Sequence, residues 1–122
     1  MQNDLHQKCM AIAIEEAKKA KSNGDWPFGA IMTKNGEIVG KGHVKDKSGG
    51  DVTDHAELVA IRDACHNLKS NNLEGCTIYC TNEPCLMCAA GIFQANIGKL
   101  SLELRAMTFY VYYAQENYGS KT

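Results

Sequence analysis

Two short stretches of this sequence carry residue types that could do metal chemistry. His55, Ala56 and Glu57 form one stretch, and Cys85 and Cys88 follow about thirty residues later. One imidazole and two thiolates are borderline-soft ligands that suit Zn²⁺. Cys85 and Cys88 are three positions apart, so on a helix both sulfur atoms lie on one face and can bind one ion. The sequence therefore predicts one zinc ion per chain, held by His55, Cys85 and Cys88.

Three protein ligands leave the fourth position of a tetrahedral zinc site open for water, whereas a structural zinc normally has four protein ligands. Zinc lowers the pKa of such a water to about 7 and makes hydroxide available at neutral pH. Glu57 lies two residues from His55 and is placed to move protons without binding the ion. This set predicts hydrolysis at an amidine-like ring carbon, in which Glu57 protonates a ring nitrogen and then the departing ammonia.

Both stretches are predicted to open helices. Apolar residues recur with helical spacing over 54–69, and Pro84 suits the first position of a second helix. At a helix start, unpaired N–H groups and the positive end of the dipole favour thiolate over thiol. We expect the two helix starts to converge on the metal.

The rest of the chain predicts one mixed sheet covered by helices. A first helix is expected over 4–23, with a capping box at Asp4 and Gln7 and a stop at Gly24. Asn35-Gly36 is a strong hairpin signal, because both central positions of that turn need a positive φ. The polar residues 45–53 predict an exposed loop and a candidate mobile lid. Strands are expected at 28–33, 37–44, 76–81 and 97–104, with a further strand or short helix at 107–113.

Length and composition indicate one ordinary globular domain over residues 1–122, with 44% hydrophobic and 22% charged residues. The longest apolar run, 85–93, is too short for a membrane span, and no secretory leader is visible. Six cysteines without an export signal favour the reducing cytoplasm. A net charge of −1 provides no global positive field for a phosphate backbone.

At these residues the sequence resembles the cytidine-deaminase-like superfamily of zinc deaminases, whose H-x-E and P-C-x-x-C signature it contains. The resemblance extends from the first helix to about Leu100 and is closest to the branch of guanine deaminases and tRNA-type adenosine deaminases. It implies a three-layer α/β/α sandwich with a mixed sheet of about five strands. The stretches that carry it are Pro27-Phe28-Gly29-Ala30, His55-Ala56-Glu57-Leu58 with Ile61-Arg62, and Glu83-Pro84-Cys85-Leu86-Met87-Cys88.

The resemblance also implies roles for individual residues. It assigns zinc binding to His55, Cys85 and Cys88. Glu57 becomes the proton shuttle, the backbone N–H of Ala56 donates to the substrate ring carbonyl, and Phe28 packs on the base.

The chain departs from the family pattern in two places. The family usually has an asparagine at the end of the second strand, and that place falls on Val44, whose side chain cannot hydrogen-bond the substrate. Such a loss typically costs about 1–3 kcal/mol, enough to change substrate preference. His43 could replace the asparagine if the strand slips by one residue; otherwise it points to the opposite face. The C-terminal part also looks shorter than usual, and partner subunits could complete the pocket.

Several alternatives stay open on the sequence. Cys85 and Cys88 could form a redox dithiol, or Cys76 or Cys80 could close a structural zinc site. Trp26 could line the rim of a pocket or anchor a loop.

Among functions, we favour a hydrolytic deaminase of a free, guanine-like purine that forms a homo-oligomer, with a dimer preferred. A tRNA adenosine deaminase, a cytosine or cytidine deaminase, and a non-catalytic zinc-binding oligomer are the alternatives.

Overall fold

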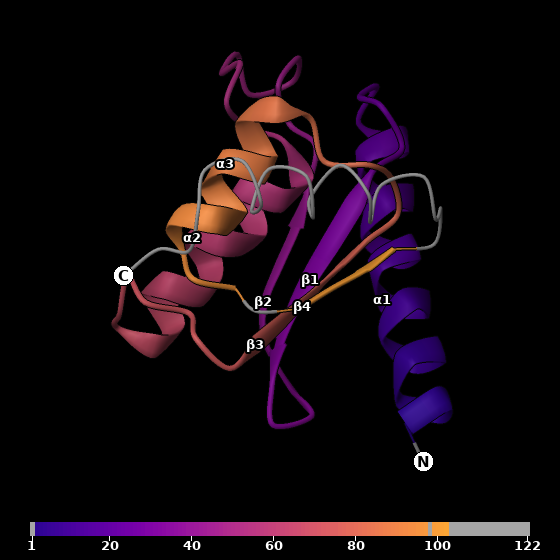
Figure 1. Ribbon diagram of the computed structural model, residues 1–122. Helices are drawn as coiled ribbons and strands as arrows, with labels where there is room; N and C mark the ends of the chain where they lie inside the picture. Colours follow the sequence, from indigo (N-terminus) through magenta and orange to yellow (C-terminus); the bar gives the residue numbers. More distant parts are fainter. Residues whose placement is uncertain (1, 98, 103–122) are drawn as a thin grey trace.

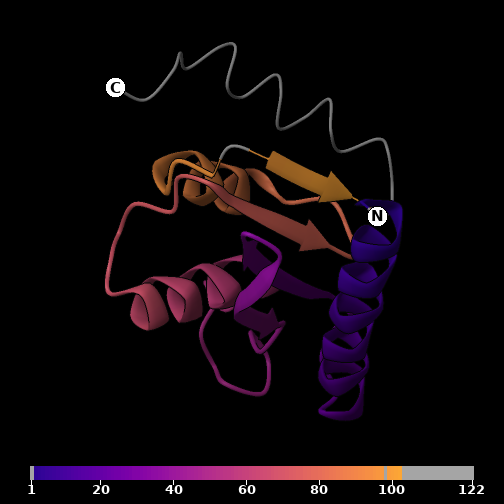
Figure 2. The ribbon, with the colours of Figure 1, turned by 90° about the horizontal axis from the view of Figure 1, so that it is seen from below.

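A mixed β-sheet forms the middle layer of the structure, with helix α1 on one face and helices α2 and α3 on the other (Figures 1 and 2). The computed structural model describes residues 2–97 and 99–102. The sheet has the strand order β2-β1-β3-β4, in which β1 is antiparallel to β2 and β3, and β3 is parallel to β4. In chain order the elements are α1 (Gln2–Ser22), β1 (Gly29–Lys34), β2 (Glu37–His43), α2 (Ala56–Leu68), β3 (Cys76–Cys80), α3 (Leu86–Gln94) and β4 (Lys99–Leu102).

The predicted mixed sheet and its helical layers are confirmed for the described residues. Four strands are present there, and the expected further element at 107–113 lies outside the described residues. The hairpin is confirmed in detail, since φ is 52° at Asn35 and 81° at Gly36. The capping box at Asp4 is wrong, because α1 already begins at Gln2. Asp4 lies in the first turn of α1, where its negative charge is equally favoured by the helix dipole.

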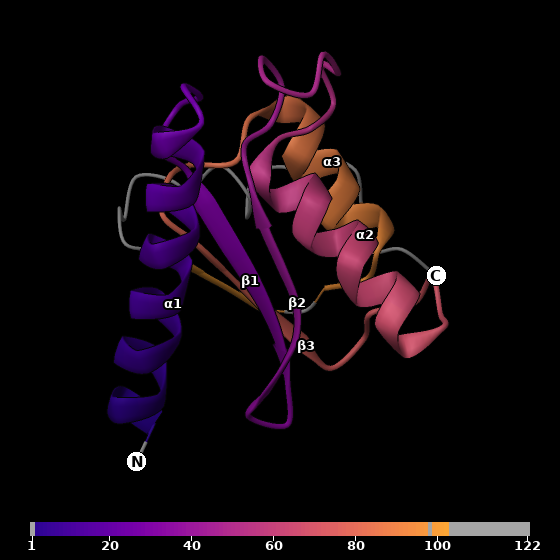
Figure 3. The same ribbon diagram turned by 180° about the vertical axis from the view of Figure 1, so that it is seen from behind.

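Helix α2 lies very close to strand β2 because the strand presents glycines to it. A Cβ atom on Gly42 would lie 2.5 Å from the backbone oxygen of Ala56 and from the backbone nitrogen of Ala60. A Cβ on Gly40 would lie 2.7 Å from the oxygen of Ala60. Both alanines are fully buried, so the helix packs on the strand backbone to backbone (Figure 3). A bond from the Lys41 N–H to the Asp63 carboxylate, 2.9 Å long, adds to this contact.

Helix α1 packs on the opposite face of the sheet in the same manner. A Cβ on Gly29 would lie 2.2 Å from the oxygen of Ala13 and 2.5 Å from the nitrogen of Ala17. Ile31 and Tyr79 are buried in the core cluster that this helix covers. The sheet is thus clamped between two helices that approach it through small residues. Within the described residues, no helix is long and apolar enough to span a membrane.

The loop between β2 and α2 is exposed, as predicted, but a buried carboxylate anchors it. Asp25 accepts hydrogen bonds from the backbone N–H groups of Lys47 (3.2 Å) and Ser48 (3.0 Å). It also accepts a 2.6 Å bond from the Ser48 hydroxyl. The side-chain bond from Ser48 holds the pKa of Asp25 below its ordinary value. The loop is therefore tied to the end of α1 rather than hanging free.

Candidate metal centre and substrate pocket

Two helix starts place the predicted ligands. His55 is the N-cap residue of α2, and Cys85 is the N-cap residue of α3, both with extended backbone. Neither side chain caps its own helix, so both are free to point elsewhere. Cys88 lies in the first turn of α3. The prediction that Pro84 occupies the first helical position is wrong by two residues: α3 begins at Leu86, because Cys85 keeps the extended conformation of a cap.

The ligand atoms lie as close together as one zinc ion requires. The Nδ1 atom of His55 is 3.4 Å from the sulfur of Cys85 and 3.6 Å from the sulfur of Cys88. All three donor atoms lie within 4.8 Å of one another. Tetrahedral zinc with ordinary bond lengths separates a nitrogen ligand from a sulfur ligand by about 3.6 Å. The residues present therefore fit a zinc ion in both donor type and spacing.

The same cluster bears on the alternative metal and redox interpretations. Among residues 2–97 and 99–102, the group that could hold this ion contains His55, Cys85 and Cys88 and no fourth ligand. Cys76 and Cys80 are buried in β3 and belong to the apolar core. The closed structural site is thus not supported in this part of the chain. A redox dithiol would leave the position of the imidazole between both sulfurs unexplained.

Glu57 lies beside the ligands on the first turn of α2 and is 3% exposed. Burial raises the pKa of its carboxyl group to about 7, although hydrogen bonds from its own backbone N–H and from Cys88 act to lower it. Burial thus favours the protonated form of Glu57, whereas a cation bound by the neighbouring ligands would favour the carboxylate, so this side chain could change its protonation state there. This is the property that a proton shuttle needs.

The electrostatics of Cys88 differ from the expectation. Burial, and next the nearby Glu57 carboxylate and Cys85, raise the pKa of the Cys88 thiol above its ordinary value. The helix start alone therefore does not favour the thiolate there, because burial outweighs the dipole. A bound cation inverts this balance and deprotonates a coordinating thiol. The Cys88 thiolate thus calls for a positive charge that the surrounding protein does not supply.

A pocket of about 270 Å³ opens beside the metal cluster. One wall is aromatic: the rings of Trp26 and Phe28 are stacked, with centroids 6.4 Å apart and planes inclined by 10°. Trp26 is 60% exposed, and the ammonium group of Lys47 lies 5.8 Å from its ring centroid. Both roles considered for Trp26 have a counterpart in the structure, since it lines the pocket and contacts Lys47 of the loop after β2. The complete lining is Trp26, Phe28, Val44, Asp46, His55, Glu57, Asn82, Glu83 and Cys85.

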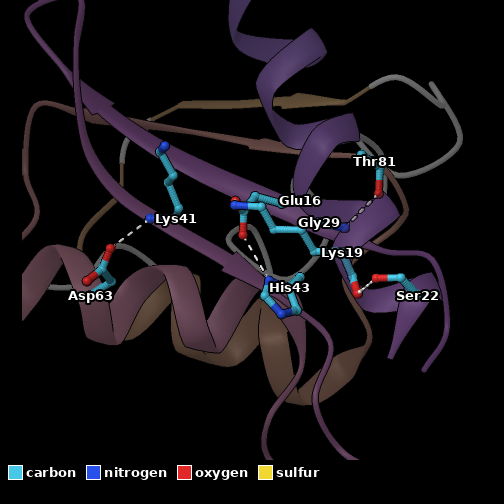
Figure 4. A network of polar contacts seen from close by, with 8 residues as sticks. All are labelled: Glu16, Lys19, Ser22, Gly29, Lys41, His43, Asp63 and Thr81. Carbon is cyan, nitrogen blue, oxygen red and sulfur yellow. Dashed lines mark hydrogen bonds and ion pairs between the residues drawn. The ribbon is translucent and has the colours of Figure 1, made fainter. Parts of the chain in front are cut away.

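Strand register separates the two residues considered at the end of the second strand. Val44 is buried and lines the pocket, as its place in the sequence predicted. His43 does not belong to the pocket lining; its Nδ1 atom lies 2.9 Å from Oε1 of Glu16 on helix α1 (Figure 4). The strand has not slipped, so His43 lies on the opposite face and does not replace the usual asparagine.

Asn82 and Asp46 are pocket residues that the sequence interpretation missed. Asn82 directly precedes the Glu83-Pro84-Cys85 stretch, and this adjacency was the signal that could have found it. Asp46 lies in the loop that the sequence assigned to a lid, so its place at the pocket depended on the tertiary contact of that loop with Asp25. Ala56 is the first residue of α2, and its N–H is one of those without a partner inside the helix.

Comparison with known proteins identifies the family behind this geometry. Residues 3–104 match the model of the cytidine and deoxycytidylate deaminase zinc-binding region, which is most of the chain. The chain belongs to this family. Its members bind zinc in this region, and His55, Cys85 and Cys88 are the cluster in the described residues that fits the ion.

Proteins similar to this chain include tRNA-specific adenosine deaminases and a guanine deaminase. The chain is 43% identical to the tRNA-specific adenosine deaminase of Aquifex aeolicus over 91 residues, 75% of this chain and 60% of that protein. A solved structure from a study of tRNA:A34 deaminases matches with a TM-score of 0.77 and 36% identity, covering 79% of this chain and 74% of the other. Guanine deaminase from Bacillus subtilis matches with a TM-score of 0.76 and 34% identity, covering 80% and 62%.

These similarities establish the cytidine-deaminase-like α/β fold. The chain spans about 60% of the length of the first curated relatives that it matches.

Proposed function

We propose that this chain is a zinc-dependent hydrolytic deaminase that acts on the purine ring of adenosine in tRNA. The observation that carries the chemistry is the cluster of three ligand atoms, His55 Nδ1 and the sulfurs of Cys85 and Cys88, beside the buried Glu57. The observation that favours adenosine in tRNA over the free guanine-like purine expected from the sequence is the 43% identity to a tRNA-specific adenosine deaminase.

A zinc ion held by His55, Cys85 and Cys88 would supply a water activated for attack at neutral pH. Glu57 holds the proton taken from this water and transfers it to a ring nitrogen of the substrate. It then takes the remaining proton from the oxygen now bound to the ring carbon and delivers it to the amino group, which leaves as ammonia when the bond between carbon and nitrogen breaks. The water oxygen remains on the ring carbon, so the products are inosine and one ammonia per water consumed.

The pocket residues position the base for this reaction. The ring of Phe28, itself stacked on Trp26, packs on one face of the purine. The unpaired N–H of Ala56 donates a hydrogen bond to the ring edge, where charge develops during attack. Both groups are fixed by regular structure, since Phe28 precedes β1 and Ala56 begins α2.

The experiment combines metal analysis with product analysis. Purified protein is expected to contain about one zinc per chain and to release ammonia and inosine from tRNA. Glu57→Gln is expected to keep its zinc and to lose about 10²- to 10⁴-fold in rate. Glu15→Gln, an exposed change on α1, is the matched control and is expected to retain full activity. Full activity in Glu57→Gln, or zinc without turnover on any base, nucleoside or RNA, would refute the proposal.

Free guanine is the second candidate substrate. It is supported by the similarity to guanine deaminase of Bacillus subtilis and by the acidic residues Asp46 and Glu83 at the pocket, which do not attract phosphate. Binding of tRNA is expected to weaken steeply with added salt, because phosphate contacts release counterions. Turnover of free guanine that is insensitive to salt, without turnover of tRNA, would favour the second candidate.

We also infer that the chain works as a homo-oligomer, with a dimer preferred. Leu86 supports this inference, because it follows the metal ligand Cys85 and is 64% exposed, which is high for a large apolar side chain. Light scattering at several protein concentrations tests it, and a monomer at every concentration would contradict it.

A further inference from the structure

Asn82 carries a buried polar atom that lacks a hydrogen-bond partner. Its Oδ1 atom is shielded from solvent and has no partner among the described residues. Its Nδ2 group donates a 3.1 Å hydrogen bond to the backbone oxygen of Glu83. Asn82 is also one of the residues that line the pocket beside the metal cluster. Asn82 therefore belongs to the wall of the candidate substrate site and carries an acceptor that the described residues leave unused.

The orientation of this amide is determined by the protein itself. The oxygen of Glu83 can only accept, so the NH₂ end of the Asn82 amide must face it and the oxygen end is left over. The backbone around Asn82 is held in place by its neighbour Thr81. The Thr81 hydroxyl accepts a 3.0 Å bond from the N–H of Gly29, and the Thr81 N–H donates a 3.0 Å bond to the oxygen of Gly29 (Figure 4).

These two hydrogen bonds join the residue after β3 to the first residue of β1, so they fix the position of Asn82 relative to Phe28 on the aromatic wall. Buried acceptors in folded proteins are nearly always satisfied, and each exception calls for an explanation. The side chains of Val44 and Phe28 beside it are apolar, so outside the metal cluster the other acceptors at the pocket are the carboxylates of Asp46 and Glu83. The remaining polar groups at the centre have other tasks: His55 and Cys85 face the ion, and Glu57 moves protons.

We propose that Oδ1 of Asn82 is a specificity-determining acceptor that binds a hydrogen-bond donor of the substrate, either an N–H on the edge of the purine or a hydroxyl of the ribose. The inference rests on the proposed function for the class of substrate. It assigns to Asn82 a role in binding the substrate, and none in the proton transfers. A ligand that lacks the donor leaves Oδ1 unpaired and is bound less tightly.

The test measures ligand affinity directly, without turnover. The chain has a single tryptophan, Trp26, and it lines the same pocket, so its fluorescence reports ligand binding. Zinc-loaded protein with Glu57→Gln, which does not consume the ligand, is titrated with adenosine, 2′-deoxyadenosine and 9-methyladenine. The same titrations are repeated with Asn82→Ala and Asn82→Leu, of which the second keeps the side-chain volume. Asn71→Ala, in the exposed turn between α2 and β3, is the matched control.

Loss of the acceptor is expected to weaken adenosine binding about five- to tenfold in both Asn82 variants and to leave the Asn71 control unchanged. An equal loss for all three ligands assigns the donor to the purine. A loss for adenosine alone assigns it to the 2′-hydroxyl, and a loss for both nucleosides but not for 9-methyladenine assigns it to another part of the ribose.

Thermal unfolding separates this role from a structural one. Asn82→Leu removes an unpaired buried acceptor together with one hydrogen bond to the Glu83 oxygen, so its melting temperature is expected to fall only slightly. Unchanged affinity for every ligand would overturn the inference, and so would the absence of measurable binding to the chain with Asn82 intact. If that chain binds adenosine through Asn82 but the wild-type protein releases no ammonia from any substrate, the proposed function fails and the role of Asn82 stands.

Discussion

Replacing Gly42 with alanine should weaken zinc binding, although Gly42 lies on strand β2 and acts on the metal centre only through helix α2. The added Cβ would lie 2.5 Å from the backbone oxygen of Ala56, whereas ordinary contacts begin at 3.4 Å. The helix start must therefore retreat by about 0.9 Å, because the obstructing atoms are backbone and cannot rotate away. His55 directly precedes Ala56 and would be displaced with it.

This displacement is large on the scale of metal coordination. Ligand distances in a zinc site hold to within about 0.2 Å. The Nδ1 atom of His55 now lies 3.4 Å and 3.6 Å from the two sulfurs, so a retreat of the helix start takes the imidazole out of range. We expect Gly42→Ala to lower stability by about 1–3 kcal/mol or more, as overpacking does, and to weaken zinc binding markedly.

The assay pairs zinc retention against a chelator with thermal unfolding. Gly40→Ala is the matched control: its Cβ would lie 2.7 Å from the oxygen of Ala60, one turn further from His55. It is expected to cost similar stability but to retain zinc better than Gly42→Ala. Equal zinc loss in both variants, or full zinc retention in Gly42→Ala, would refute the reasoning that the strand positions His55.

Three further predictions follow from single contacts. Cys88→Ala leaves two ligands, so metal analysis should find far less than the roughly one zinc per chain of the wild type. Burial acts to raise the pKa of Glu16, but hydrogen bonds with Lys19 and His43 outweigh burial and lower that pKa. The ionised carboxylate therefore stabilises the fold at pH values above the ordinary pKa of Glu16. This stabilisation is lost as the pH falls through the lowered pKa. Unfolding of Glu16→Gln, followed from pH 7 to pH 3, should accordingly show a smaller acid-induced loss of stability than the wild type. Asp25→Ala removes three hydrogen bonds from the loop that it anchors, and trypsin should cut this loop faster while zinc content stays unchanged.

The parts of the fold that could be predicted from sequence are those with local causes. The Asn35-Gly36 turn depends on two φ values that these residue types favour, and both are present. The metal cluster was predictable because its two halves are short motifs at helix starts, where the helix itself sets the direction of the ligand side chains. Helix bounds were less accurate, as α3 shows: a cap residue and a first-turn residue have similar sequence preferences, so Pro84 did not reveal that Cys85 is the cap.

The parts that could not be predicted depend on contacts distant in sequence. Glu16 is buried and bonds to His43 only because α1 covers the end of β2, and no local sequence pattern predicts this contact. The unpaired oxygen of Asn82 is visible only when the neighbouring strands are in place. The raised pKa of Cys88 likewise arises from burial in the assembled core, whereas the dipole expected from sequence is a property of the helix alone.

The two kinds of packing around the centre have different consequences for its rigidity. The sheet side is backbone against backbone, since Gly42 meets the main chain of α2, and such a contact can be relieved only by moving whole elements. The contact between α2 and α3 is different: a Cβ on Gly91 would lie 2.7 Å from Cδ2 of Leu58, the far end of a flexible side chain. His55 is therefore joined to the sheet through main-chain contacts of α2, whereas α3 meets α2 at Gly91 through a side chain. A volume change at Gly91 should accordingly disturb the metal centre less than one at Gly42.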